Sequence, residues 1–237
     1  MKHIRRFLPL VLAGVFSVPF AAAQSTFDFN VGFGAVQDSA ASGIDYTTNL
    51  LCTPGSSDPY CTTANSLSGF MLGFGGNLML WKHFGVGAEV SFQPAKQTYY
   101  TCNATCIETL GLAGEGISSF TEQSRTTFYD FNGIFVPIRS KKAQLQISGG
   151  IGGANFKTYE NFTAPATAIS SSESASQYAG SLNKFQVHGG VGVQIYLTDH
   201  FFVRPQFDVH YVNNFTPFGR STPIVAQVWV GYSFGGQ

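Results

Sequence analysis

The chain has 237 residues with 13 basic and 13 acidic side chains, and only 11% of its residues are charged. This length fits one ordinary domain or one membrane barrel. Three of the basic residues, Lys2, Arg5 and Arg6, lie at the very start, and without them ten basic side chains face 13 acidic ones. The slightly acidic balance that remains argues against a nucleic-acid partner.

Residues 1–23 have the features of a secretory signal peptide. A basic head is followed by an apolar centre over residues 7–20 and by three alanines at 21–23. Proline and glycine interrupt the apolar centre, which is shorter than the roughly 20 residues that a spanning helix needs. We expect cleavage before Gln24. The exported chain is then one domain over residues 24–237.

Eight later segments alternate between apolar and polar residues, which is the period of a strand with two different faces. One face carries mainly Phe, Leu, Ile and Val, and the other mixes Gly with Asp, Glu, Arg, Gln and His. In chain order the segments are 27–35, 67–81, 84–92, 129–135, 145–151, 185–197, 201–211 and 224–234.

The predicted connections alternate between long and short. The long ones are 38–66, 95–123, 158–183 and 213–222, and the short ones are 82–83, 138–142 and 198–200. Outer-membrane barrels have long external loops and short periplasmic turns, so we expect both termini in the periplasm. The third long connection contains Ser170, Ser171, Ser172, Ser174 and Ser176, and we expect it to be a mobile polar segment.

The apolar face is too bulky to fill the interior of an eight-stranded barrel, whereas the polar face suits a small lumen. Trp81, Tyr129, Tyr211 and Tyr232 lie near segment ends, where aromatic girdles are expected. The prediction is an all-β fold, an eight-stranded antiparallel up-and-down transmembrane β-barrel. The competing fold is a soluble lipocalin-like barrel with its faces reversed, which would need no detergent.

By this pattern the chain resembles the outer-membrane β-barrel family of the OmpA and OmpX type. The supporting runs are the aromatic-rich closing segment 225–234 and the turn-flanking segments 80–85 and 129–133. The family commonly ends on an aromatic residue, whereas three residues follow Phe234 here. The resemblance implies a cell outer-membrane location, contact with outer-membrane lipid and lipopolysaccharide, and insertion by the barrel-assembly machinery. It implies no cell-wall tether, because we find no peptidoglycan-binding domain after the barrel.

Seven ionisable side chains fall on the predicted inner face. We expect a structural network of ion pairs and hydrogen bonds around the single arginine, because buried charges must be paired. The alternative is a narrow channel or carrier for small solutes. The seven residues are Asp28, Glu89, Asp130, His188, Arg204, Asp208 and His210.

A remote alternative is a surface hydrolase in which Asp208 orients His210, since the two share one face of a strand. The pair is similar to the Asp-x-His element of outer-membrane omptin proteases, but the Asp-x-Asp pair of that family is missing here. We therefore predict neither an enzyme nor a cofactor.

The four cysteines form two local pairs in polar loops, Cys52 with Cys61 and Cys102 with Cys106. In an exported protein such pairs predict disulfides, although pairing across the two loops stays open. Only one histidine, His83, lies between Cys52 and Cys106 in the sequence, and we place it at the opposite membrane face, so no metal is predicted.

The expected function is a structural or surface-contact role, with an extracellular ligand bound through loops 38–66, 95–123 and 158–183.

Overall fold

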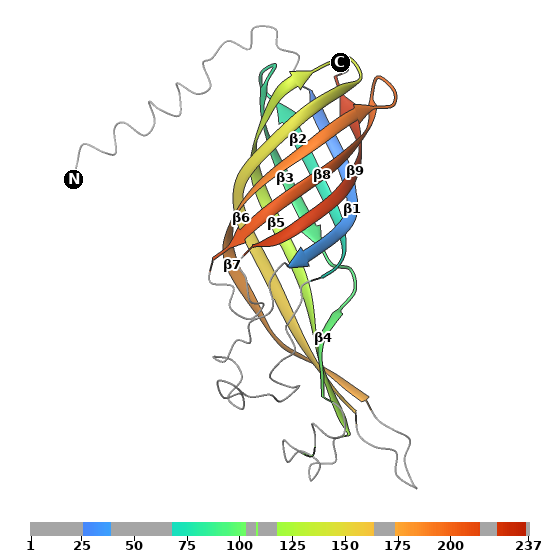
Figure 1. Ribbon diagram of the computed structural model, residues 1–237, viewed down its shortest axis with the longest axis vertical. Helices are drawn as coiled ribbons and strands as arrows, with labels where there is room; N and C mark the ends of the chain where they lie inside the picture. Colours follow the sequence, from blue (N-terminus) through green and yellow to red (C-terminus); the bar gives the residue numbers. More distant parts are fainter. Residues whose placement is uncertain are drawn as a thin grey trace, which may run out of the picture.

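Nine antiparallel strands make up the described fold, and three long ones, with a short fourth beside them, extend well beyond the other five (Figure 1). The computed structural model describes residues 26–38, 68–102, 108, 118–163, 174–213 and 222–235. Within these residues no helix is long and apolar enough to cross a membrane. The strands are β1 (Phe27–Asp38), β2 (Gly69–Met79), β3 (Phe84–Phe92), β4 (Gln97–Cys102), β5 (Ser119–Arg139), β6 (Ala143–Thr163), β7 (Ser174–Tyr196), β8 (Phe201–Val212) and β9 (Pro223–Phe234).

Eight of these strands close into a ring. Their hydrogen-bonded order is β3-β2-β1-β9-β8-β7-β6-β5, and β3 pairs with β5 to complete it. The first and last strands lie side by side, with Phe27 opposite Phe234. The predicted eight-stranded antiparallel barrel is therefore confirmed, and the closed ring avoids the unpaired strand edge that lipid does not tolerate.

Apolar side chains cover the outside of the ring and polar side chains fill its inside. Phe29 and Phe131 are 48% and 67% exposed, whereas Asn30 and Gln194 are fully buried. A soluble barrel would bury its apolar face instead. The lipocalin-like alternative is therefore wrong, and the exterior is that of a barrel in lipid.

Three short turns join the strands at one end of the ring. They cover residues 80–83, 140–142 and 197–200, close to the predicted 82–83, 138–142 and 198–200. Backbone hydrogen bonds close each of them, from Leu80 N to Phe84 O at 3.0 Å, from Ser140 N to Ala143 O at 2.8 Å and from Leu197 N to Phe201 O at 2.8 Å. We call this the turn end, and the opposite end the loop end.

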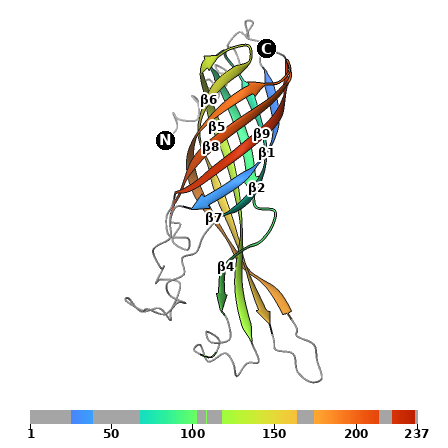
Figure 2. The same cartoon turned by 45° about the vertical axis from the view of Figure 1, so that its right-hand side comes forward.

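At the loop end, β5, β6 and β7 continue far beyond the ring, with β4 beside β5 (Figures 1 and 2). We call this part the projecting sheet and define it as β4 with residues 119–125, 157–163 and 174–181. The prediction of loops over all of 95–123 and 158–183 is wrong here, and Ser174 and Ser176 belong to β7. These segments are polar on both faces, so they lack the alternation that predicts a strand.

Aromatic rings gather around the outside of the turn end. Phe84 stacks on Phe135 with ring centroids 5.0 Å apart, and Tyr232 contacts Phe201 and Phe234 at 5.1 and 4.8 Å. Trp81, in the first short turn, is 57% exposed. Such a belt is typical of the boundary between lipid and water.

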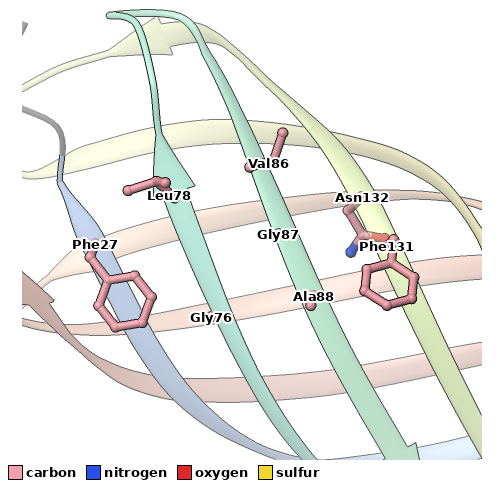
Figure 3. Close-up of a pocket in the computed structure, with 8 residues that line it drawn as sticks. All are labelled: Phe27, Gly76, Leu78, Val86, Gly87, Ala88, Phe131 and Asn132. Carbon is pink, nitrogen blue, oxygen red and sulfur yellow. The ribbon is translucent and has the colours of Figure 1, made fainter. Parts of the chain in front are cut away.

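The outer surface is hollowed between Phe27 of β1 and Phe131 of β5, as Figure 3 shows. Gly76, Gly87 and Ala88 form the floor of this hollow, whose volume is about 450 Å³. The two rings border it on either side and are themselves exposed. Because it opens outward among exposed apolar side chains, the hollow belongs to the lipid-facing surface.

Candidate functional site: the polar interior of the barrel

The lumen is layered, with apolar clusters toward its ends and polar side chains between them. The cluster at the loop end joins residues of six strands, and a smaller one at the turn end consists of Met79, Ile134 and Val136. Side chains thus fill the interior, as expected for eight strands. The loop-end cluster is Val36, Met71, Phe128, Ala154, Phe156, Val212 and Val225.

Arg204 of β8 is the centre of the middle layer. It is 1% exposed, and its guanidinium donates to Glu89 Oε1 at 2.7 Å and to Gln146 Oε1 at 2.9 Å. The guanidinium carbon also lies 5.6 Å from the ring centroid of Trp229. A buried charge needs such partners, because an unpaired one is costly to remove from water.

Glutamine side chains extend this layer in both directions. Gln206 Nε2 donates to Glu89 at 3.2 Å and to Asp208 at 3.0 Å. On the other side, Gln194 Nε2 donates to Asp28 at 3.2 Å, and Gln194 Oε1 accepts from Gln146 at 2.7 Å. A continuous chain of hydrogen bonds therefore links Asp28, near the turn end, to Asp208.

Little free space is left around Arg204. The cavity lined by Asn77, Glu89, Arg204 and Gln206, among others, has a volume of about 10 Å³, which is room for about one water molecule. A conducting path through the described lumen would have to displace these side chains.

A second group lies closer to the loop end. Asp130 Oδ1 accepts from Gln186 Nε2 at 2.7 Å, and His210 Nδ1 lies 3.1 Å from Gln186 Oε1. His188 Nε2 lies 2.6 Å from Asn132 Oδ1. The imidazoles of His188 and His210 stack with centroids 5.2 Å apart, and the ring of Phe128 stacks on His210 at 4.5 Å.

All seven residues that the sequence places inside the barrel are buried, with exposures between 1% and 8%. Sequence reasoning put them into one network around Arg204, whereas the structure divides them. Asp28, Glu89, Arg204 and Asp208 share the hydrogen-bonded chain described above. Asp130, His188 and His210 form the second group.

The sequence pattern places the glutamines on the inner face, but sequence reasoning left them out of the network and missed the large rings that point inward. Gln146, Gln186 and Trp229 are each 5% exposed or less. Their position in the alternation is the signal that could have found them, because each shares the inward parity of its strand. Glycines make room for the largest ring, since a Cβ on Gly32 or Gly73 would lie 2.7 or 2.5 Å from Trp229.

The arrangement that the hydrolase alternative requires is not the one observed. His210 Nδ1 faces Gln186, while Asp208 accepts hydrogen bonds from Gln206. The aspartate therefore does not hold the imidazole in the orientation that such catalysis needs.

Several predicted features lie outside the described residues. They are the signal peptide at 1–23, most of loop 38–66, and Cys52, Cys61 and Cys106. Cys102 ends β4, but its side chain also lies outside the described part. The cleavage and the two disulfides therefore stay predictions.

A closed ring of eight strands with an apolar exterior and a filled polar interior defines a transmembrane β-barrel of the outer-membrane type. The chain belongs to the outer membrane protein β-barrel domain family, whose sequence profile matches residues 8–234. It is an integral outer-membrane protein, and the resemblance to the OmpA and OmpX type is confirmed.

Solved structures of several outer-membrane proteins resemble the chain at low sequence identity. Ail, the attachment invasion locus protein of Yersinia pestis, is 11% identical with a TM-score of 0.43, covering 89% of this chain and 99% of that one. Neisserial surface protein A is 9% identical with a TM-score of 0.46, covering 88% and 97%. OprG from Pseudomonas aeruginosa is 14% identical with a TM-score of 0.44, covering 90% and 97%. Among curated proteins no match was found.

Proposed function

We propose that the barrel anchors a surface-contact module in the outer membrane, and that this module is the projecting sheet with the loops around it. The observation that carries the proposal is strand length. A tilted strand crosses a bilayer in about 9–11 residues, and β3 and β8 have 9 and 12, whereas β5, β6 and β7 have 21, 21 and 23. At about 3.3 Å per residue, the seven or eight residues that each of these strands adds to the projecting sheet extend roughly 25 Å beyond the ring.

The chemistry of the projecting sheet supports a position in water. Residues 157–163 are all partly or fully exposed and include Lys157, Glu160 and Asn161. Both faces are therefore wetted, unlike the ring, where one face meets lipid.

A local cluster ties this sheet together. Lys96 Nζ lies 4.1 Å from the centroid of the Tyr159 ring and donates to Ser176 Oγ at 2.9 Å. Tyr159 also contacts Tyr178, which is 52% exposed, at 5.8 Å. These contacts hold β6, β7 and the segment before β4 as one surface. Exposed tyrosines on an ordered sheet are good anchors for a protein partner.

The outer edge of β7 adds a second kind of contact. Residues 174–181 pair with β6, and pairing with β8 starts only at Gln186. Within the described residues no strand pairs with this edge of β7, and such an edge presents backbone donors and acceptors to which an extended segment of a partner can add.

The proposal places the turn end and both termini in the periplasm and the projecting sheet outside the cell. Loops 38–66, 95–123 and 158–183 then flank the contact surface, and disulfides between Cys52 and Cys61 and between Cys102 and Cys106 would close two of them. Lipid and lipopolysaccharide surround the ring, which the barrel-assembly machinery inserts. The module binds and does not catalyse. The filled lumen gives no support to the channel alternative.

The test removes the sheet and keeps the ring. Thr158 pairs with Gly180 and Gln97 with Ser124, so an Asn-Gly turn can replace residues 159–179 and another can replace residues 98–123. We expect this variant to stay in the outer membrane and to keep its faster gel mobility before boiling. Binding of the displaying cells to epithelial monolayers and immobilised matrix proteins should fall to the level of cells without the protein.

The matched control replaces Lys141 and Lys142, at the turn end, with serine. It should bind like the unmodified protein. Equal binding by the shortened and unmodified proteins, or none by the unmodified protein, would contradict the proposal.

A further inference from the structure

Three potential metal ligands meet in the lumen, below the apolar cluster at the loop end. They are Asp130 of β5, His188 of β7 and His210 of β8, and their exposures are 6%, 5% and 4%. A carboxylate oxygen and one nitrogen of each imidazole all lie within 4.8 Å of one another. Because the three residues come from three strands, no spacing in the sequence predicts the cluster.

The neighbouring amides leave one nitrogen of each imidazole available. Asn132 Oδ1 lies 2.6 Å from His188 Nε2, and Gln186 Oε1 lies 3.1 Å from His210 Nδ1. An acceptor beside one ring nitrogen holds the proton there and leaves a lone pair on the other nitrogen. On His188, Nδ1 is buried without a hydrogen-bond partner, and Nε2 lies 3.9 Å from Asp130 Oδ1. A buried polar atom without a partner is costly, and it suggests that a ligand completes the group.

The charge of the interior also favours a cation. The buried residues of the described chain include four carboxylates, those of Asp28, Glu89, Asp130 and Asp208, but a single guanidinium, that of Arg204. That guanidinium already pairs with Glu89. Since a buried charge needs compensation, a divalent cation beside Asp130 would stabilise the ionised form of its carboxylate.

We propose that Asp130, His188 and His210 bind one divalent transition-metal ion of the zinc, copper or nickel class inside the barrel. Imidazole nitrogens with one carboxylate suit these ions, whereas calcium and magnesium prefer oxygen ligands throughout. Metal–ligand distances are about 2.0–2.2 Å, so the ligand atoms must move closer together than they now lie. The two imidazoles, which stack at an angle of 18°, turn out of that stack when the ion binds.

Gln186 and Asn132 act as positioning residues in this site. The Gln186 amide contacts both Asp130 and His210, and Asn132 contacts His188. They fix the orientation of the ligands without binding the ion themselves. Replacing such partners typically weakens metal affinity by about 10–100-fold.

The experiment uses a background without competing ligands, in which the four cysteines are replaced by serine and His83 and His200 by glutamine. His83 and His200 lie in the short turns at the turn end, whereas the cluster lies toward the loop end. The protein is refolded into detergent micelles with zinc chloride, so that the apolar cluster cannot block entry, and free zinc is removed. We expect one zinc per chain in this background, and at least a tenfold loss of affinity in Asp130→Asn, His188→Gln and His210→Gln.

Folding is followed separately through gel mobility before and after boiling, so that a variant that fails to fold is recognised. For the folded background protein, cobalt(II) then gives an independent measurement, and we expect the visible absorption bands of nitrogen-ligated cobalt. Absence of both zinc and these bands would overturn the proposal. So would zinc retained equally by folded His188→Gln and His210→Gln.

Discussion

The ring and the projecting sheet share the three strands β5, β6 and β7, yet the side chains of these strands follow a different pattern in each region. In β6 the exposed positions of residues 143–156 carry the lipid-facing surface, whereas residues 157–163 show no buried position at all. The change occurs where β6 leaves the ring. This change shows that the surroundings of a strand decide which residues it can carry. Lipid surrounds the ring, and water surrounds the projecting sheet.

The two regions also differ in what lies behind each strand. In the ring, inward side chains meet others across the lumen, as Arg204 of β8 meets Glu89 of β3. Among the residues that the structure describes, the part of β6 in the projecting sheet has no buried side chain. Substitutions of the same chemical kind should therefore be costly in the ring and tolerated in the sheet.

The largest effect is expected from Arg204→Ala, because it leaves Glu89 buried without its cation. Breaking a buried pair in this way costs about 3–5 kcal/mol. The free energy of unfolding in urea, followed by the gel mobility of unboiled samples, measures it. The double variant Arg204→Met with Glu89→Gln should recover much of the loss. Equal stability of Arg204→Ala and the unmodified protein would mean that the pair does not hold the lumen.

A charged side chain placed on the outer surface distinguishes the ring from the projecting sheet more directly. Val31 is 38% exposed near the middle of β1, and Val31→Arg should destabilise the barrel by about 2–4 kcal/mol, because the charge enters lipid. Ala179→Arg, at an exposed position of β7 in the projecting sheet, should change stability little. Equal losses would indicate that the membrane boundary lies farther along β7 than we place it.

Substitutions of two glycines, one in each region, should give the smallest difference in stability between the ring and the projecting sheet. A Cβ on Gly73 would lie 2.5 Å from the Trp229 ring, whereas a Cβ on Gly180 would meet nothing within 4 Å. Gly73→Val should therefore overpack the lumen and cost about 1–3 kcal/mol, while Gly180→Val should be nearly neutral. Urea unfolding of the two variants side by side measures the difference. A greater loss for Gly180→Val would contradict the account of the lumen as filled.

The ring was predictable because lipid outside and polar packing inside impose a strict alternation on each strand. The predicted segment 84–92 coincides with β3, and the closing segment 224–234 differs from β9 by one residue. The projecting sheet was not predictable in this way, since neither face of residues 157–163 has to be apolar. Polar residues at these positions are compatible with a strand and with a loop equally well.

The lumen was predictable in its members but not in its contacts. Parity along each strand places Asp130, His188 and His210 inside the barrel. Which of them meet depends on the register between neighbouring strands, for example His188 opposite His210. That register is set by the packing of the whole ring, and a single strand sequence does not contain it.

The seam between β1 and β9 governs the order in which the ring can be completed. Phe27 and Phe234 are neighbours across this seam, although almost the whole chain separates them in sequence. A chain still lacking β9 presents two open edges, on β1 and on β8, and such edges readily pair with other chains. Closure therefore requires β9, and a partly folded chain needs those two edges shielded until β9 pairs with both.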